Sequence, residues 1–327
     1  MKRYRCKENL CNYCSVLKYV IGLILCIAFL LQAGSVITYA KTYDGFRYQY
    51  NEEYDGIEIT KYKGKAQKLV IPDEIEGIPV VAIAGHACSE NKYIKKLIIS
   101  DNVKYIGDFA FYRCPKLKSV VMPKKMSVLG EFVFSSCRKL DSVKLPKNLT
   151  CLTGFDDTGF KTFHVPKQIK RIEGLSECHK LKTVTFDKDS QLEVIGPEAF
   201  FFDSALTDIE IPAGVTEIGH DAFHYCFSLK NISFSKNSKL KTIGYSAFEA
   251  CKELEEIKIP KRVTQIQKGA FLRCENLKTV TFRGKCPKLE KEAFNEIHWA
   301  ATFRVPSKYK KSYEKNMHKF GWYYAIK

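Results

Sequence analysis

A short apolar pattern recurs along most of this chain and constrains its fold more than any other feature. Eleven copies follow one another, and after a first gap of 28 residues their starts lie 20 to 25 residues apart. A period of this length, with apolar positions in fixed phase, is typical of a solenoid of stacked coils. The copies are Leu69–Ile71, Leu97–Ile99, Val120–Met122, Val143–Leu145, Phe163–Val165, Val184–Phe186, Ile209–Ile211, Ile232–Phe234, Ile257–Ile259, Val280–Phe282 and Phe303–Val305.

One clean copy of the repeat, residues 206–226, reads LTDIEIPAGVTEIGHDAFHYC. Ile209 and Ile211 flank Glu210, so a strand here points two apolar side chains inward and one polar side chain outward. Pro212 then ends the strand, because proline has no amide hydrogen to donate.

The second half of the unit is expected to lead the chain to the next strand. Gly219 is expected to allow a tight turn, and Ala222 and Phe223 are expected to begin a short helical turn whose ring fills the space between coils. One coil cannot bury its apolar face alone, whereas stacked coils can. We therefore predict an α/β fold: a right-handed leucine-rich-repeat solenoid of about ten to eleven coils of 20–25 residues, with short strands and short helical turns.

Four coils depart from the common pattern. Residues 186–196 and 234–244 replace the proline turn by a wider turn that contains serine. Residues 145–163 lose the Ala-Phe-x-x-Cys segment and read TGFDDTGF instead, and residues 165–184 carry Gly174-Leu175 in its place. We expect a local pinch or bend at the short coils, and a specific pocket there is the functional alternative.

The two ends of the chain differ from the repeats. Residues 1–40 combine a positive flank, the apolar run Tyr19–Leu31 and small residues up to Ala40, which is the plan of a secretory signal cleaved after Ala40. An uncleaved anchor is the alternative, and it would be the only membrane contact. We expect an N-terminal β-hairpin cap at 41–68, the solenoid at 69–305 and a C-terminal helical cap at 306–327, in which Ser307 caps a helix through His318.

These motifs resemble the BspA-like leucine-rich-repeat proteins of bacterial and some protozoan surfaces. The resemblance covers roughly residues 44–322 and rests on the repeated pattern IP-x-x-V-x-x-IG-x-x-AF-x-x-C-x-x-L, on the opening DGFRYQY…IEITKYKG…LVIP and on the closing VP…Y…GW. It implies an extracellular solenoid that adheres to host matrix proteins, other cells or polymers. It implies no catalytic residues.

Cysteine occupies one fixed position of the repeat. At this position we expect buried free thiols, because buried cysteine behaves as a small apolar group and stacked parallel positions give poor disulfide torsions. Cys88, Cys151 and Cys286 lie off this ladder and are the disulfide candidates. The predicted ladder comprises Cys114, Cys137, Cys178, Cys226, Cys251 and Cys274.

The sequence offers weak signals for chemistry. His220 and His224 stand four residues apart beside Asp221, but no metalloprotease glutamate accompanies them, so we predict no metal site. Cys178 precedes His179, yet a reactive thiolate needs an accessible site and Cys178 belongs to the ladder. We predict no catalytic residue and no cofactor.

The outward position of each strand is the expected binding surface. These positions form a hydroxyl-rich stripe with scattered charge, which also suits a merely soluble surface. The formal charge of +17 allows an anionic polymer as partner. The outward positions are Lys144, His164, Thr185, Glu210, Ser233, Lys258, Thr281 and Arg304.

The leading hypothesis is therefore an exported cell-surface or secreted protein, not an enzyme, that binds an extracellular protein or glycan. An envelope-anchored structural scaffold and a solenoid hydrolase are the alternatives. Nucleic acid is not an expected partner, because an export signal and an aromatic-poor face oppose it.

Overall fold

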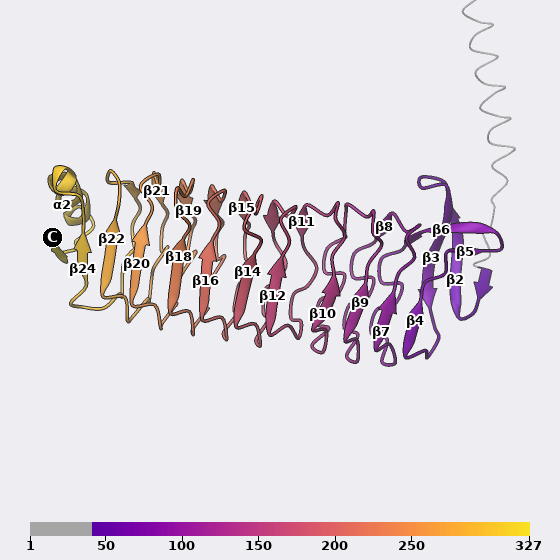
Figure 1. Ribbon diagram of the computed structural model, residues 1–327. Helices are drawn as coiled ribbons and strands as arrows, with labels where there is room; N and C mark the ends of the chain where they lie inside the picture. The colour runs from indigo at the N-terminus through magenta and orange to yellow at the C-terminus, as the bar shows by residue number, and fades with distance from the viewer. Residues whose placement is uncertain (1–40) are drawn as a thin grey trace, which may run out of the picture. The chain divides into compact units, whose positions relative to one another are not determined.

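The computed structural model describes residues 41–327, of which Thr42–Lys327 form one compact unit. Eleven short strands lie side by side along this unit (Figure 1), each within one residue of its predicted position, which confirms the solenoid. They are β4 (Lys68–Val70), β7 (Lys96–Ile98), β9 (Ser119–Val121), β10 (Ser142–Lys144), β12 (Thr162–Val165), β14 (Thr183–Phe186), β16 (Asp208–Ile211), β18 (Asn231–Phe234), β20 (Glu256–Ile259), β22 (Thr279–Phe282) and β24 (Thr302–Arg304).

These strands make the first side of the coils, and it is interrupted twice. Parallel pairing joins β4, β7, β9 and β10, then β12, β14, β16 and β18, then β20, β22 and β24. No strand pairing bridges β10 to β12 or β18 to β20 in the described residues. The sheet face therefore has two gaps.

A second set of strands, which sequence reasoning did not predict, forms the opposite side of the coils. Each has two residues and comes from the Val-x-x-Ile segment of a repeat. Seven of them pair in parallel, while β8 (Tyr105–Ile106) pairs with β6 (Ile78–Ile83). The seven are β11 (Cys151–Leu152), β13 (Arg171–Ile172), β15 (Val194–Ile195), β17 (Glu217–Ile218), β19 (Thr242–Ile243), β21 (Gln265–Ile266) and β23 (Lys288–Leu289).

The repeat glycine has a role other than the one expected. Gly219 does not adopt a positive φ; instead, a Cβ placed on it would lie 2.6 Å from the carbonyl carbon of Gly196 in the preceding coil. Gly244 stands in the same relation to Gly219, also at 2.6 Å. Glycine is needed here because successive backbones approach too closely for any side chain.

The Ala-Phe-x-x-Cys segments are turns, and the expectation of short helical turns was wrong. Asp221 and Tyr225 have φ values of 53° and 62°, which lie in the left-handed region and prevent a helix. The amide of Phe223 donates to the carbonyl of Ala247 in the next coil at 2.8 Å. Backbone groups here bond between coils, as in a sheet. Within residues 41–327 the helices are η1 (Ser307–Tyr309) and α2 (Lys310–His318).

Phenylalanine rings form a column through the core. Phe200, Phe223, Phe248, Phe271 and Phe294 are fully buried, and each ring stacks on the next with centroids 5.1 to 5.3 Å apart. The spacing follows the separation of paired strands, so one side chain per coil fills the space between neighbours.

The short coil at 145–163 keeps the turn that it was expected to lose. Phe155 takes the place of the repeat phenylalanine and stacks on Phe134 at 5.4 Å, and Thr158 takes the place of the cysteine. Leu175 takes the ring position in the following coil and is fully buried. The segment Gly154-Phe155-x-x-Thr158 is thus a degenerate copy of the motif.

Additional elements flank the repeats. At the N-terminal end β1 (Lys41–Tyr43), β2 (Phe46–Asn51), β3 (Gly56–Tyr62) and β6 form a sheet in which β2 and β3 are antiparallel, and β5 (Glu74–Ile75) pairs with β6. At the C-terminal end β25 (Ala325–Ile326) pairs with β24. Ser307 begins η1 and does not cap it, because the N-cap residue is Pro306 and no side chain caps that helix.

The predicted signal at 1–40, with cleavage after Ala40, lies outside the described residues. Within residues 41–327, none of the helices is long and apolar enough to span a membrane.

Candidate functional site

The sheet face exposes the outward residue of almost every strand. In β16, Ile209 and Ile211 are buried whereas Asp208 and Glu210 are exposed, and the same alternation holds in β12 and β20. The predicted stripe is therefore accessible over its whole length. Its exposed members are Lys144, His164, Thr185, Glu210, Ser233, Lys258 and Arg304, and Thr281 is partly buried.

Strand register brings some predicted residues together and leaves others apart. His164 lies opposite Thr185, with its Nδ1 3.0 Å from the threonine Oγ1. Thr281 lies between Lys258 and Arg304 in the next group of strands. Lys144 is separated from His164 by the gap between β10 and β12, where a hollow of about 400 Å³ opens.

The N-terminal third of the face is apolar, and sequence reasoning missed it. Val70, Ile98 and Val121 hold the outward position of β4, β7 and β9, where later coils carry polar residues. Val70 is 47% exposed and Val121 is 38% exposed. They line a groove of about 750 Å³, with Lys124 and Lys144 among the other lining residues. The signal was present in the sequence, because apolar residues fill all three positions of these strands.

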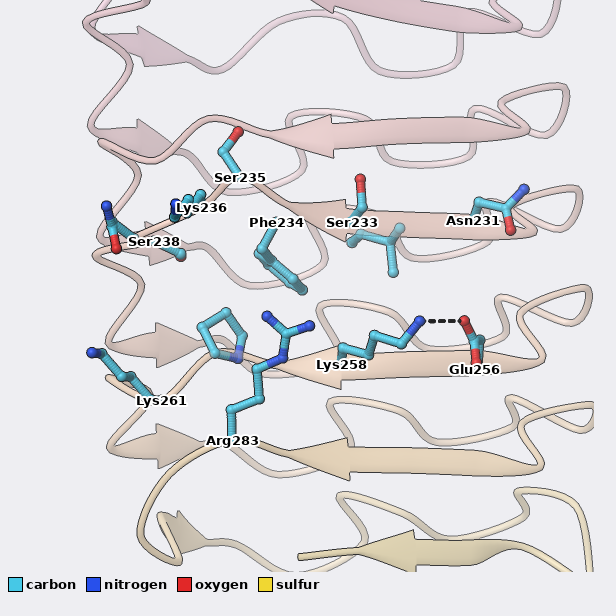
Figure 2. A pocket seen from close by; sticks show the side chains of 13 residues that line it. Asn231, Ser233, Phe234, Ser235, Lys236, Ser238, Glu256, Lys258, Lys261 and Arg283 are labelled. Carbon is cyan, nitrogen blue, oxygen red and sulfur yellow. Dashed lines mark hydrogen bonds and ion pairs between the residues drawn. The ribbon is translucent and has the colours of Figure 1, made fainter. Parts of the chain in front are cut away.

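A second, cationic pocket of about 410 Å³ lies at the gap between β18 and β20 (Figure 2). Its lining carries four cations and one carboxylate. In Figure 2, Phe234 extends from β18 toward Lys258 of β20 and toward Arg283, which directly follows β22 (Thr279–Phe282). Glu256 forms an ion pair with Lys258 at 2.9 Å. The lining cations are Lys236, Lys258, Lys261 and Arg283.

A longer turn and a proline accompany the break in strand pairing at this pocket. Ile232 and Ile257 are 25 residues apart, whereas Ile257 and Val280 are 23 apart, and the two extra residues widen the turn after β18. In the next coil, the amide of Arg283 donates to the carbonyl of Ile259 at 3.1 Å. Pro260 holds the equivalent position one coil earlier. Because proline has no amide hydrogen, the corresponding bond to β18 cannot form.

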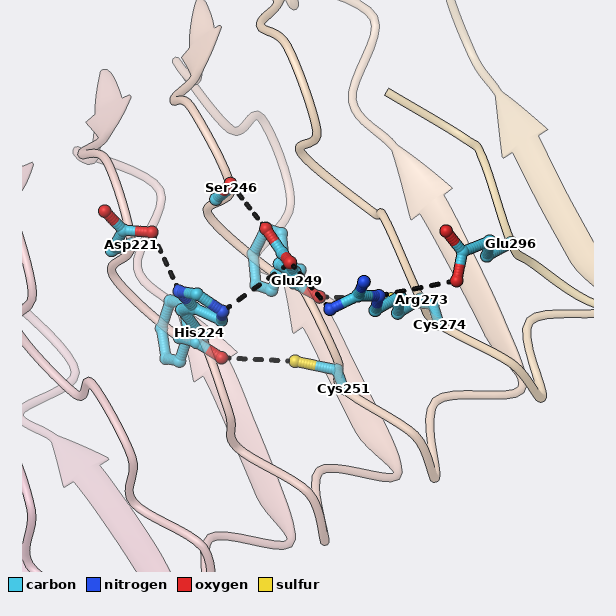
Figure 3. Close-up of polar contacts among 10 residues, drawn as sticks. Asp221, His224, Ser246, Glu249, Cys251, Arg273, Cys274 and Glu296 are labelled. Atoms are coloured by element: carbon cyan, nitrogen blue, oxygen red, sulfur yellow. Dashed lines mark hydrogen bonds and ion pairs between the residues drawn. The ribbon is translucent and has the colours of Figure 1, made fainter. Parts of the chain in front are cut away.

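A polar network crosses the turn edge of four coils (Figure 3). His224 Nδ1 lies 2.9 Å from Asp221 Oδ1, and His224 Nε2 lies 3.8 Å from Glu249 Oε1. Glu249 accepts a hydrogen bond from Ser246 and lies 3.9 Å from Arg273. Arg273 also donates to Glu296 of the fourth coil at 3.4 Å, so the network ties neighbouring turns together. His220 is exposed and does not take part in it.

The described residues contain no group of three or more histidine, cysteine or acidic side chains placed to hold a metal ion. His224 instead has one carboxylate on each side. The predicted absence of a cofactor remains a prediction.

The repeat cysteines are fully buried thiols that bond to the preceding coil. Cys226, Cys251 and Cys274 donate through Sγ to the carbonyls of Phe200, Phe223 and Phe248 at 3.1 to 3.3 Å. Burial raises the pKa of each of these thiols. Each of these carbonyls also accepts a backbone amide of its own turn, so the thiol adds a second hydrogen bond and acts as a donor in the core.

The three cysteines off the ladder are free thiols, and the disulfide alternative for them is not realised. Cys88 is buried beside Ala87, in the place of the repeat phenylalanine. Cys151 and Cys286 are partly buried; burial raises the pKa of both thiols to about 11, and in Cys151 the neighbouring Glu173 adds to the shift.

We expect alkylation to separate these two kinds of cysteine. At pH 8 Cys151 and Cys286 should react with iodoacetamide about two orders of magnitude more slowly than an ordinary thiol, because only the thiolate reacts. The ladder thiols should react only after unfolding. Peptide mass spectrometry of native and guanidinium-treated protein measures this, and rapid native labelling of Cys226 or Cys251 would contradict the packed ladder.

Parallel coils with an exposed sheet face and a buried ladder define a leucine-rich-repeat solenoid. Residues 61–176, 151–238 and 193–316 match the BspA type leucine rich repeat region, in six copies. These matches span most of the chain, which therefore belongs to the BspA-type leucine-rich-repeat family.

Solved structures of related architecture are similar to this chain at low sequence identity. A leucine-rich-repeat protein of T. pallidum is 23% identical with a TM-score of 0.48, over 65% of this chain and 90% of that one. A leucine-rich cell surface protein of Faecalibacterium prausnitzii is 24% identical with a TM-score of 0.35, over 74% and 88%. The pneumococcal vaccine antigen PcpA is 15% identical with a TM-score of 0.43, over 86% and 96%. A comparison with curated proteins finds no match.

Proposed function

We propose that this chain is an exported surface protein that binds an extracellular protein or glycan through its sheet face. The observation that carries the proposal is the exposed row of outward side chains, which runs in register between buried neighbours. Such a row presents variable side chains on a stiff support, so binding a partner costs little conformational entropy in this chain.

The face offers two kinds of contact. The groove of Val70, Ile98 and Val121 supports burial of apolar side chains, and the polar stripe from His164 onward supports hydrogen bonds and ion pairs. A protein partner would use both, whereas a glycan would use the polar part.

Replacing Lys144, Glu210 and Lys258 together by alanine tests the proposal. All three side chains are exposed, so binding to a partner found on a panel of matrix proteins and glycans should weaken at least about tenfold. The thermal midpoint should shift by less than about 2 °C, since exposed substitutions change stability little.

A matched variant on the opposite side of the coils serves as the control. Lys241, Glu217 and Lys288 are exposed residues on or beside the second set of strands and have the same charges. Their alanine variant should bind as the wild type does. Equal binding by both triple variants would reject the sheet face as the binding surface.

Export is tested separately. We expect the mature chain outside the cytoplasm to begin at Lys41, and N-terminal sequencing of fractionated cells measures this. An intact N-terminus in the membrane fraction would favour the anchored form.

A further inference from the structure

We infer that the cationic pocket between β18 and β20 binds the acidic groups of an anionic saccharide, such as a carboxylated or sulfated sugar chain. The inference rests on the proposed function and names the ligand class for one part of the sheet face. It is carried by the charge, the apolar floor and the preformed turn of this pocket (Figure 2).

The pocket holds cations that nothing in the described chain neutralises. Lys236, Lys261 and Arg283 form no ion pair with an acidic side chain of residues 41–327. Lys258 is paired with Glu256, but their side chains are 54% and 57% exposed, so the pair is weak and can be exchanged for a ligand. Arg283 can bind a carboxylate or sulfate through two parallel hydrogen bonds.

The rest of the lining suits a sugar better than an acidic peptide. Phe234 is only partly buried, and it offers an apolar surface for the C–H face of a sugar ring. Ser233 is exposed, and its hydroxyl can both donate to and accept from sugar hydroxyls. Pockets that combine an apolar floor with a few polar groups are typical small-ligand sites.

The turn that frames the pocket is already formed. The amide of Ser238 donates to the carbonyl of Ser235 at 3.2 Å, and Asn237 has a φ of 63°. Ser238 is buried and accepts a hydrogen bond from the amide of Leu240 at 3.3 Å. A ligand would thus find the turn ordered, which lowers the cost of binding.

The other 25-residue coil gives an internal contrast. There the same turn reads Phe186-Asp187-Lys188-Asp189-Ser190. Its two carboxylates already have partners, since Asp189 pairs with Lys167 at 3.0 Å and Asp187 Oδ1 lies 3.1 Å from His164 Nε2. In the cationic pocket serine and asparagine take the places of these aspartates, so the extended turn alone does not make an anion site.

Two pocket variants and one control test the assignment. The first is K236Q/K261Q/R283Q, whose three side chains are exposed. The second is S235D/N237D, which places two carboxylates among the lining cations and replaces the hydrogen bond from Ser235 to Glu210. The control, K116Q/K139Q/K180Q, removes the same charge from exposed lysines of distant coils. Calorimetric titration of the purified full-length protein with a heparin-derived octasaccharide measures the affinity.

We expect each pocket variant to weaken octasaccharide binding at least about tenfold and the control less than about twofold, with binding to the wild type falling as salt is raised. No binding by the wild type, unchanged binding by the pocket variants or equal loss in the control overturns the inference. Equal affinity for poly-glutamate, lost in the same variants, also overturns it, because the site would then be a general polyanion site.

The two proposals fail in different ways. If the pocket variants bind the octasaccharide normally while the Lys144, Glu210 and Lys258 variant loses its panel partner, only the saccharide assignment falls. If neither set of variants affects any binding, the sheet face itself is rejected.

Discussion

Replacing Phe223 by alanine is expected to lower the free energy of unfolding by about 3–5 kcal/mol. The side chain is fully buried, and its ring lies 5.1 Å from both Phe200 and Phe248. Its loss removes the burial of a large apolar group and leaves a cavity between two rigid coils, which cannot close because the backbone bonds of the neighbouring turns hold them apart.

Urea denaturation followed by circular dichroism measures this effect. Because each coil contacts only its neighbours, the damage should be local, and unfolding of the variant can split into two transitions. Tyr245→Ala is the control, since Tyr245 is 46% exposed and its loss should cost less than about 0.5 kcal/mol. If the free energy of unfolding of the Phe223 variant lay within about 1 kcal/mol of the wild-type value, that result would contradict the packed ring column.

Replacing Asp203 by asparagine is expected to raise stability at neutral pH by about 1–3 kcal/mol. Asp203 takes the ladder position between Cys178 and Cys226 and is fully buried. Its Oδ1 accepts a hydrogen bond from the amide of Cys178 at 2.7 Å, whereas its Oδ2 has no partner within residues 41–327. Burial holds the pKa of this carboxyl well above its usual range.

The sign of the pH dependence follows from that shift. Below about pH 4 the carboxyl is protonated in both the folded and the unfolded chain. As the pH rises above this, the unfolded chain ionises first, so the wild type loses stability until the pH passes the raised pKa of the folded state. The asparagine side chain of the Asp203→Asn variant does not titrate, and the variant should therefore gain on the wild type as the pH rises from about 4 to 7.

Unfolding free energies at several pH values measure this difference. Asp208→Asn is the control, because Asp208 is exposed and its neighbours Thr207 and Asn231 lower the pKa of its carboxyl. That variant should show no comparable gain. Parallel pH profiles for the wild type and the Asp203 variant would show that Asp203 does not carry the buried proton.

The candidate site could be predicted only in part. The outward position of each strand was readable from alternation, so Glu210 and Lys258 could be assigned to one face. Val70 and Val121 hold the same outward position in their strands, but their side chains resemble core residues. Alternation alone does not tell which apolar side chain of a wholly apolar strand points outward.

The cationic pocket could not be read from the sequence. Lys236, Lys261 and Arg283 belong to three different coils and line one pocket, at the place where strand pairing is interrupted between β18 and β20. The longer turn was visible as two extra residues, but their effect on strand pairing depends on how neighbouring coils stack.

The sequence by itself determined the period of the chain, the strands of the sheet face and the residues that stack in columns, because each of these follows from spacing within one repeat. The tertiary structure decided where strand pairing on the sheet face is interrupted and why glycine is needed at position 219. It also decided that the Ala-Phe segments are turns whose backbone groups bond to the neighbouring coil. These features depend on distances between one coil and the next, and such distances are not written in any single copy of the repeat.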